Sequence, residues 1–331
     1  MLILGSASDI NVAKKAVNVL EEMHVSYDIR VASAHRTHSL IKDIMTNDTD
    51  EVEVFIAIAG LAAHLPGVIA SYTNKPVIGV PVEAKLDGLD SLLSCTQMQL
   101  GTPVATVGID RADNAAHIAC QIIACNDDKL KQRLCDKRLA YVDKMLSSQE
   151  DLVAEIGGKH YVKSKSNPKK YENASEVADI NKDARVLIVS ENDYNMDVVD
   201  KIIDTLDILD ISYDYKTVPA TVNPDELEKV MKAADDIVDL YVAVCSNSSI
   251  LSGAMVSHTT KMVIGVPTGS KLQGFDSLLT MVEMPPGVPT ATLGIDAGVN
   301  AALFVGRVLS LYNDDVRDML DEFVKTLQNA Y

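Results

Sequence analysis

Short apolar runs alternate with helical patterns along the first part of the chain. Residues 1–4, 29–31, 54–59, 77–80 and 104–107 are almost entirely apolar. Such runs predict strands that are buried on both faces, as in a parallel sheet. Between the first two runs, Asp9 stands at a candidate N-cap position, and a helical face carries the apolar residues Val12, Ala13, Ala16, Val17, Leu20 and Met23. The alternation predicts a doubly wound α/β fold whose ligands bind beyond the carboxyl ends of the strands.

The same pattern occurs a second time. VIGVPVEAKLDGLDSLL from Val77 matches VIGVPTGSKLQGFDSLL from Val263 at 12 of 17 positions, an offset of 186. GTPVATVGID from Gly101 matches GVPTATLGID from Gly287 at the same offset. Near the start, LILGSASD is matched with VLIVSEND at an offset of 184, which places Val189 opposite Gly5. A repeat of this length indicates two whole domains rather than a solenoid.

The segment between the two repeats differs in composition. Residues 127–156 are strongly charged with a thin apolar stripe, which predicts a long helix that is exposed or packs on a partner. Gly157 and Gly158 are expected to end it, and the polar segment 159–183 is typical of a linker. We therefore predict a first domain at 1–157, a linker at 158–183 and a second domain at 184–331, which ends in a helix at 314–328.

Charge and composition exclude some classes of function. The net charge of -17 argues against a nucleic-acid partner, which requires a basic face, but not against a small anionic substrate held by one arginine and backbone amides. The five cysteines form no CxxC pair, which favours reduced thiols in a cytosolic protein. No signal segment or apolar run long enough to cross a membrane is visible, so we expect a cytoplasmic protein without membrane contact.

Three loops follow predicted strands and carry the candidate chemistry. The loop GSASD at 5–9 offers hydroxyls and helix-terminal amides to an anion, and a carboxylate at Asp9 to sugar hydroxyls. The loop SAHRT at 33–37 places His35, a candidate proton carrier, beside Arg36, a candidate phosphate ligand. The loop GLAAHLPG at 60–67 has small residues that let a ligand ring approach the backbone, and His64, which could equally be an ordinary helix-end histidine.

The second repeat serves as an internal control for these loops. Thr221 and Val222 replace His35 and Arg36, and Ile250 replaces His64. The IGVP strand and several polar positions are common to both halves. Residues shared by both halves are those that the fold needs, so the residues found only in the first half are candidates for chemistry. Drift in a redundant loop is the competing interpretation.

The first repeat resembles the family of 5-(carboxyamino)imidazole ribonucleotide mutases, also called PurE. The resemblance is carried by GSASD at 5–9, SAHRT at 33–37, AGLAAHLPG at 59–67, IGVPV at 78–82, GLDSLLS at 88–94 and NAAHIACQIIA at 114–124. It implies two tandem flavodoxin-like three-layer (α/β/α) domains, each with a parallel sheet, the second of them non-catalytic. It also implies a homo-oligomer, in which four tandem chains would be equivalent to an octamer of single domains.

The resemblance further implies an enzyme of purine biosynthesis, without metal or organic cofactor. It would move a carboxyl group from the exocyclic nitrogen of the imidazole to ring carbon 4, with His35 as general acid and base. The implied substrate-binding residues, in addition to Arg36 on the phosphate, are Ser6, Ser8, Asp9, Ser33, Ala34, Gly60, Ala62, His64 and Leu65.

The chain departs from the family pattern after the VPV strand, where Glu83 and Ala84 replace a Gln-Ser pair in a loop that looks one residue shorter, and at Gln99, which replaces a proline. Two alternatives therefore stay open. One is an enzyme of the same fold that carboxylates aminoimidazole ribonucleotide directly with carbon dioxide, and the other is a nucleotide-binding scaffold without activity.

Overall fold

The computed structural model describes residues 1–156, 178–192, 195–269 and 272–329. Gly157, Gly158 and most of the predicted linker lie outside these residues. The elements of the first repeat are β1 Leu2–Leu4, α1 Ile10–Glu22, β2 Ile29–Val31, α2 His38–Asn47, β3 Phe55–Gly60, α3 Leu65–Tyr72, β4 Val77–Val82, α4 Leu89–Thr96, β5 Ala105–Thr106, α5 Ala112–Ile123 and α6 Asp128–Ile156, with short 3₁₀ turns at Ala7–Asp9 and Leu86–Gly88. All five predicted strands are present, with ends that differ by a few residues.

The second repeat builds the same succession of elements. They are β6 Val186–Ser190, α7 Met196–Ile208, β7 Tyr213–Thr217, α8 Pro224–Ala234, β8 Leu240–Cys245, α9 Ile250–His258, β9 Val263–Pro267, α10 Phe275–Val282, β10 Ala291–Thr292, α11 Gly298–Leu309 and α12 Asp314–Asn329. Ile180, from the end of the predicted linker, is buried in the core of this unit.

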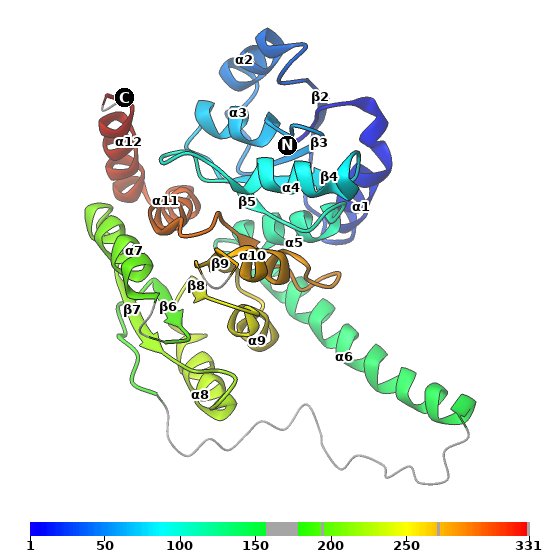
Figure 1. The fold of residues 1–331 in the computed structure, drawn as a ribbon, viewed down its shortest axis with the longest axis vertical. Coiled ribbons are helices and arrows are strands. Elements are labelled where there is room, and N and C mark those ends of the chain that lie inside the picture. Colours follow the sequence, from blue (N-terminus) through cyan, green and yellow to red (C-terminus); the bar gives the residue numbers. More distant parts are fainter. Residues whose placement is uncertain (157–177, 193–194, 270–271, 330–331) are drawn as a thin grey trace.

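The two halves share one continuous sheet. The strand order is β2-β1-β3-β4-β5-β10-β9-β8-β6-β7, so each half has the flavodoxin-like order, and the predicted fold class is confirmed. Pairing is parallel within each half and antiparallel where β5 meets β10, at Thr106 and Thr292. The apolar cores lie on both faces of this sheet, and the core that includes α1, α5, α7 and α11 runs across both halves (Figure 1).

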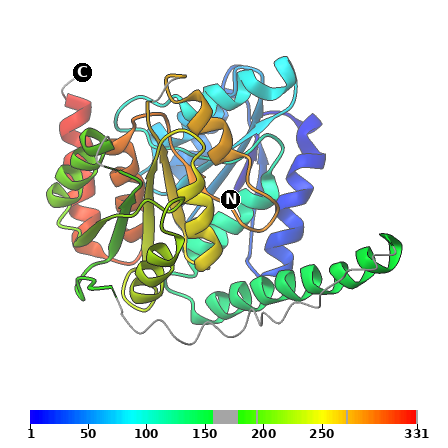
Figure 2. The ribbon, with the colours of Figure 1, turned by 60° about the horizontal axis from the view of Figure 1, so that its bottom comes forward.

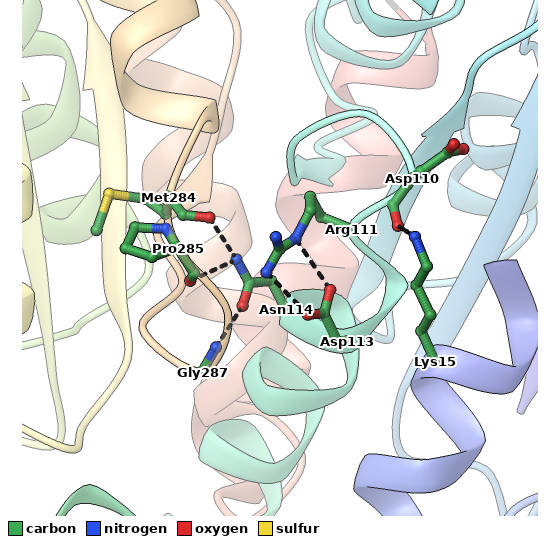
Figure 3. A network of polar contacts seen from close by, with 8 residues as sticks. All are labelled: Lys15, Asp110, Arg111, Asp113, Asn114, Met284, Pro285 and Gly287. Carbon is green, nitrogen blue, oxygen red and sulfur yellow. Dashed lines mark hydrogen bonds and ion pairs between the residues drawn. The ribbon is translucent and has the colours of Figure 1, made fainter. Parts of the chain in front are cut away.

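Two equivalent asparagines, Asn114 and Asn300, make hydrogen bonds across the junction between the halves; Figure 3 shows those of Asn114. Asn114 on α5 donates from Nδ2 to the carbonyl oxygens of Met284 and Pro285, at 3.0 and 3.1 Å, and its Oδ1 accepts from Gly287 N at 2.9 Å. Asn300, 186 residues later, makes the matching contacts with Gln99 O (2.9 Å) and Gly101 N (3.0 Å). The two halves therefore meet as two copies in a symmetric dimer do, within one chain.

Each unit's last helix packs on the other unit. On α6, Arg138 donates from Nη2 to the carbonyl oxygen of Val256, and Tyr141 contacts Gly287. On α12, Asp321 accepts a hydrogen bond from Asn74. The prediction of a long helix at 127–156 is confirmed, and its later part extends away from the body of the molecule (Figure 2). None of the helices within the described ranges is long and apolar enough to cross a membrane.

Candidate functional site

The carboxyl ends of β1, β2 and β3 are adjacent in the sheet, so the three loops that follow them lie together. In the first loop, Ser6 Oγ caps the 3₁₀ turn Ala7–Asp9 by accepting from Ser8 N at 3.2 Å. Ser8 Oγ lies 2.8 Å from Ser6 Oγ and 2.9 Å from Asp9 Oδ1. Asp9 occupies the N-cap position of α1 as predicted, but its side chain makes no capping hydrogen bond, because the 3₁₀ turn has its own cap in Ser6.

Ser33 and Thr37 hold the second loop together by hydrogen bonds. Thr37 Oγ1 accepts from Ser33 N at 2.8 Å, and Ser33 Oγ accepts from the backbone N and the Nε of Arg36 at 3.3 and 3.4 Å. Arg36 Nη2 donates to Gly5 O at 3.3 Å. The guanidinium is exposed and lies beside the first loop, where an anion bound to the amides of that loop would meet it.

The third loop brings a second imidazole to His35. Nε2 of His35 and Nδ1 of His64 are 2.9 Å apart, and the ring centroids are separated by 4.9 Å. Since one ring nitrogen must donate and the other accept, a single proton lies between the two rings. Both histidines are exposed. The pair thus lies at the surface, where a ligand could reach it, rather than in the apolar core.

The remaining residues of the third loop differ in their exposure. Gly60 is half-buried, and a Cβ placed on it would lie 3.4 Å from Cβ of Ala84, so the loop after β4 approaches it closely. Ala62 is exposed. Leu65 is buried in the apolar core under α3, which leaves its backbone rather than its side chain for any contact with a ligand.

Asp110 is a residue near the site that the sequence analysis missed. Its Oδ1 accepts from Glu83 N at 3.1 Å, which holds the start of the loop 83–88, and its carbonyl accepts from Lys15 Nζ at 2.9 Å (Figure 3). Its backbone has a positive φ of 58°. The repeat contained the signal: Asp296 in the second GID motif also has a positive φ and accepts from Gly269 N. The contact therefore belongs to the fold of both halves and positions the loop after β4.

The sheet register corrects the alignment of the two halves near β1. The matched residues Val77 and Val263 pair with Phe55 and Tyr241, which fixes the offset of 186 for β3 and β8. Leu2 pairs with Ile56, and Ile188 with the equivalent Val242, so the offset is also 186 at β1 and the expected offset of 184 is wrong. Gly5 is therefore equivalent to Glu191, not to Val189. The short match LILGSASD/VLIVSEND was misleading because apolar strand residues resemble each other at either offset.

The corrected alignment shows how the second half differs. The half-buried Glu191 accepts a hydrogen bond from Ser246 N, and burial raises the pKa of its carboxyl above the usual range. The position of Asp9 is taken by Asn195, which is buried and bonded to Thr268 and Val244. The second half thus places a carboxylate at the strand end where the first half has a glycine beside a guanidinium.

Within the described residues, no group of three or more His, Cys, Asp and Glu side chains gathers as it would around a metal ion. All five cysteines are free thiols, and burial raises the pKa of Cys95 and of Cys120 to about 12. Cys95 and Cys120 are therefore protonated packing residues rather than nucleophiles.

Comparison with known proteins gives a consistent result. A family model described as AIR carboxylase matches residues 1–144 and again residues 185–330. A probable N5-carboxyaminoimidazole ribonucleotide mutase of Methanothermobacter thermautotrophicus is 39% identical over 97% of this chain and 96% of its own length. The N5-carboxyaminoimidazole ribonucleotide mutase of Methanocaldococcus jannaschii is 56% identical over 45% of this chain and 94% of its own. The crystal structure of Treponema denticola PurE aligns with 44% of this chain and 92% of that one, with a TM-score of 0.41 and 24% identity.

Proposed function

This chain belongs to the AIR carboxylase family, and on that premise we propose that its first half is an N5-carboxyaminoimidazole ribonucleotide mutase of purine biosynthesis. The observation that carries the proposal is the pair His35–His64 at 2.9 Å, next to the Arg36–Gly5 contact. Both features occur in the first half alone, since Thr221, Val222 and Ile250 stand at the equivalent positions of the second.

In the proposed binding mode the nucleotide spans the three loops. Arg36 and the amides of the first loop hold the phosphate, and Ser6, Ser8 and Asp9 bind the ribose-phosphate end. Ser33 and Ala34 line the same pocket. The imidazole ring lies over Gly60 and Ala62, where the absence of side chains allows it to approach the backbone, and Leu65 contributes through its backbone.

The proposed chemistry exchanges a carboxyl group and a proton between two atoms of the substrate. The bond from the exocyclic nitrogen to the carboxyl carbon breaks and releases carbon dioxide, and that nitrogen takes up a proton. A new bond then forms between carbon dioxide and ring carbon 4, and the proton on that carbon leaves. His35 is the residue that delivers and removes the proton, and His64 shares it through their hydrogen bond. The site is open in this structure, so the bound nucleotide would itself have to cover the carbon dioxide and hold it near the ring between the two steps.

A second candidate is the direct carboxylation of aminoimidazole ribonucleotide, which the description of the family model names. Purified protein distinguishes the two activities. A mutase converts the carboxyamino substrate without added bicarbonate, and a carboxylase requires carbon dioxide and the uncarboxylated ribonucleotide. A chain that turns over neither substrate would be a scaffold and would refute both.

We propose that the second half is an architectural domain. Its reciprocal contacts through Asn114 and Asn300 reproduce within one chain the pairing of two single domains. Four tandem chains would then form the equivalent of an octamer, with domains at 1–157 and 184–331. We place this assembly in the cytosol, where its free thiols stay reduced.

A further inference from the structure

Arg307, on α11 of the second half, is a buried cation without a counter-ion. The residue is 1% exposed. Its Nη2 donates to the carbonyl oxygens of Ala70 and Gly101, at 3.2 and 3.3 Å, while Nε and Nη1 have no hydrogen-bond partner among the described residues. No carboxylate in the described part of the chain forms an ion pair with it, and burial lowers its pKa to about 9. An unpaired buried charge is strongly unfavourable, and the described residues offer this guanidinium no anionic acceptor.

Arg307 lines a cavity of ≈ 660 Å³. Sites for small organic ligands typically have volumes of about 300–1,000 Å³. It lies between α12 and two segments of the first half, residues 70–74 and 99–102. These segments precede β4 and β5, so the cavity is at the edge of the sheet opposite to the candidate active site. Lys325 on α12 adds a second positive charge. Asp321, which also lines the cavity, accepts from Asn74 Nδ2 at 2.6 Å.

The equivalent groove, beside Gln121, has different hydrogen bonds. There Gln121 replaces Arg307, and its Nε2 donates to Thr260 O at 3.0 Å and Lys261 O at 3.3 Å. The carbonyl of Val256, equivalent to that of Ala70, accepts from Arg138, which stands at the position of Val324.

The two grooves differ accordingly in volume. The cavity beside Gln121 and Arg138 measures ≈ 20 Å³, against ≈ 660 Å³ beside Arg307. In the smaller groove, the guanidinium of Arg138 on α6 donates to the carbonyl of Val256 and leaves little space. In the larger groove, the guanidinium that donates to the carbonyl of Ala70 belongs to Arg307 on α11, and the space beside α12 stays open. A hydrogen bond to this carbonyl can therefore be made without an open cavity, as the groove beside Gln121 shows.

We propose that this cavity binds a small oxyanion with a phosphate or carboxylate group, held by Arg307 and Lys325. Nε and Nη1 are covered in this structure, each with less than 1 Å² accessible, so the guanidinium would turn toward the cavity to reach the anion. Charge-assisted hydrogen bonds to the anion would then neutralise the buried charge. Because Arg307 comes from the second half and the opposite wall from the first, the bound anion would stabilise the junction between the halves.

The test is equilibrium dialysis of the full-length protein with inorganic phosphate and, in a separate arm, with succinate. The candidate active site also offers an arginine to phosphate, so Arg36→Gln is the background in which binding is counted. We expect this variant to retain one anion site per chain in at least one arm, and the further substitution Arg307→Gln to weaken that site at least tenfold. No binding to the Arg36→Gln protein in either arm, or binding that is unchanged by Arg307→Gln, would overturn the proposal.

A matched variant separates ligand binding from folding. Arg307→Gln together with Val324→Arg rebuilds the arrangement of Gln121 and Arg138, so the carbonyl of Ala70 keeps a donor and the groove is filled. In the Arg36→Gln background, the bound anion should raise the melting temperature by a few degrees, and this shift should disappear in the rebuilt variant although that variant is folded. An equal shift in both proteins would contradict the assignment to Arg307.

Discussion

His35 and His64 come from the ends of two different strands, and Nε2 of the first lies 2.9 Å from Nδ1 of the second. Their hydrogen bond places one proton between two imidazoles at the edge of the sheet where a ligand of this fold binds. Neither sequence loop contains this relationship by itself. It arises because β2 and β3 both flank β1 in the sheet.

Replacement of His35 by asparagine should remove turnover but preserve nucleotide binding. Asparagine keeps a polar group near His64 but cannot carry the proton, and the loss of a general acid–base residue lowers kcat by about 10²- to 10⁴-fold. Turnover of the carboxyamino substrate and binding of the nucleotide by calorimetry measure the two effects. The control is Thr221→Asn at the equivalent position of the second half, which should have wild-type kinetics. A His35→Asn enzyme with a normal kcat would remove this residue from the mechanism.

Gly5→Glu should impair binding of the substrate phosphate. Glutamate is the residue at the equivalent position 191, and a carboxylate beside the guanidinium of Arg36 would compete with the phosphate for it. Loss of a charge-assisted contact corresponds to about 1.5–3 kcal/mol, or a rise in KM of roughly ten- to a hundredfold. Steady-state kinetics over a range of substrate concentrations measures this rise.

Gly5→Ala is the steric control for that variant. A Cβ on Gly5 would meet its nearest atom, Ile58 O, at 3.6 Å, an ordinary contact. The alanine enzyme should therefore keep a KM close to that of the wild type. If both substitutions raised KM equally, the effect would come from backbone geometry rather than charge, and the proposed phosphate site beside Arg36 would lose its support.

Stability should fall in mild acid because of His117 on α5. Burial, partly opposed by Asp113, lowers the pKa of this histidine from 6.5 to about 4. Between these values the unfolded chain binds a proton that the folded chain does not, so the free energy of unfolding decreases as the pH falls below 6.5. At 1.4 kcal/mol for each pH unit, the contribution at pH 5 is a loss of about 2 kcal/mol.

Urea denaturation at pH 7 and pH 5 tests this effect against His117→Leu. Leucine is the residue at the equivalent position 303, where it is fully buried in the same core. The difference in unfolding free energy between the two pH values should be about 2 kcal/mol smaller in the variant than in the wild type. Equal acid sensitivity of the two proteins would show that His117 does not titrate in this range.

Asn114→Ala and Asn300→Ala should each destabilise the chain. Either substitution leaves a backbone N–H and at least one carbonyl unpaired at the junction of the halves, at a cost of about 1–3 kcal/mol. The midpoint of urea unfolding measures the loss, with the exposed Asn126→Ala as control. Because the two contacts are equivalent, the two losses should be similar. A negligible loss in both variants would mean that these hydrogen bonds do not hold the halves together.

The sequence alone determined the strands, the duplication and the three loops of the first half. These features depend on short-range patterns: buried parallel strands are apolar throughout, and loops at strand ends carry small and polar residues. The comparison between the halves also identified His35 and Arg36 as residues present in one copy only.

The tertiary structure decided which residues meet. It corrected the offset at β1 and placed Glu191 opposite Gly5, because register is fixed by hydrogen bonds between strands that are far apart in the sequence. It joined the two sheets through β5 and β10 and packed α6 and α12 on the opposite units. It also revealed Asp110 behind the loop after β4 and Arg307 in front of an open cavity. No local pattern encodes such contacts, since each depends on side chains brought together only when the sheet assembles.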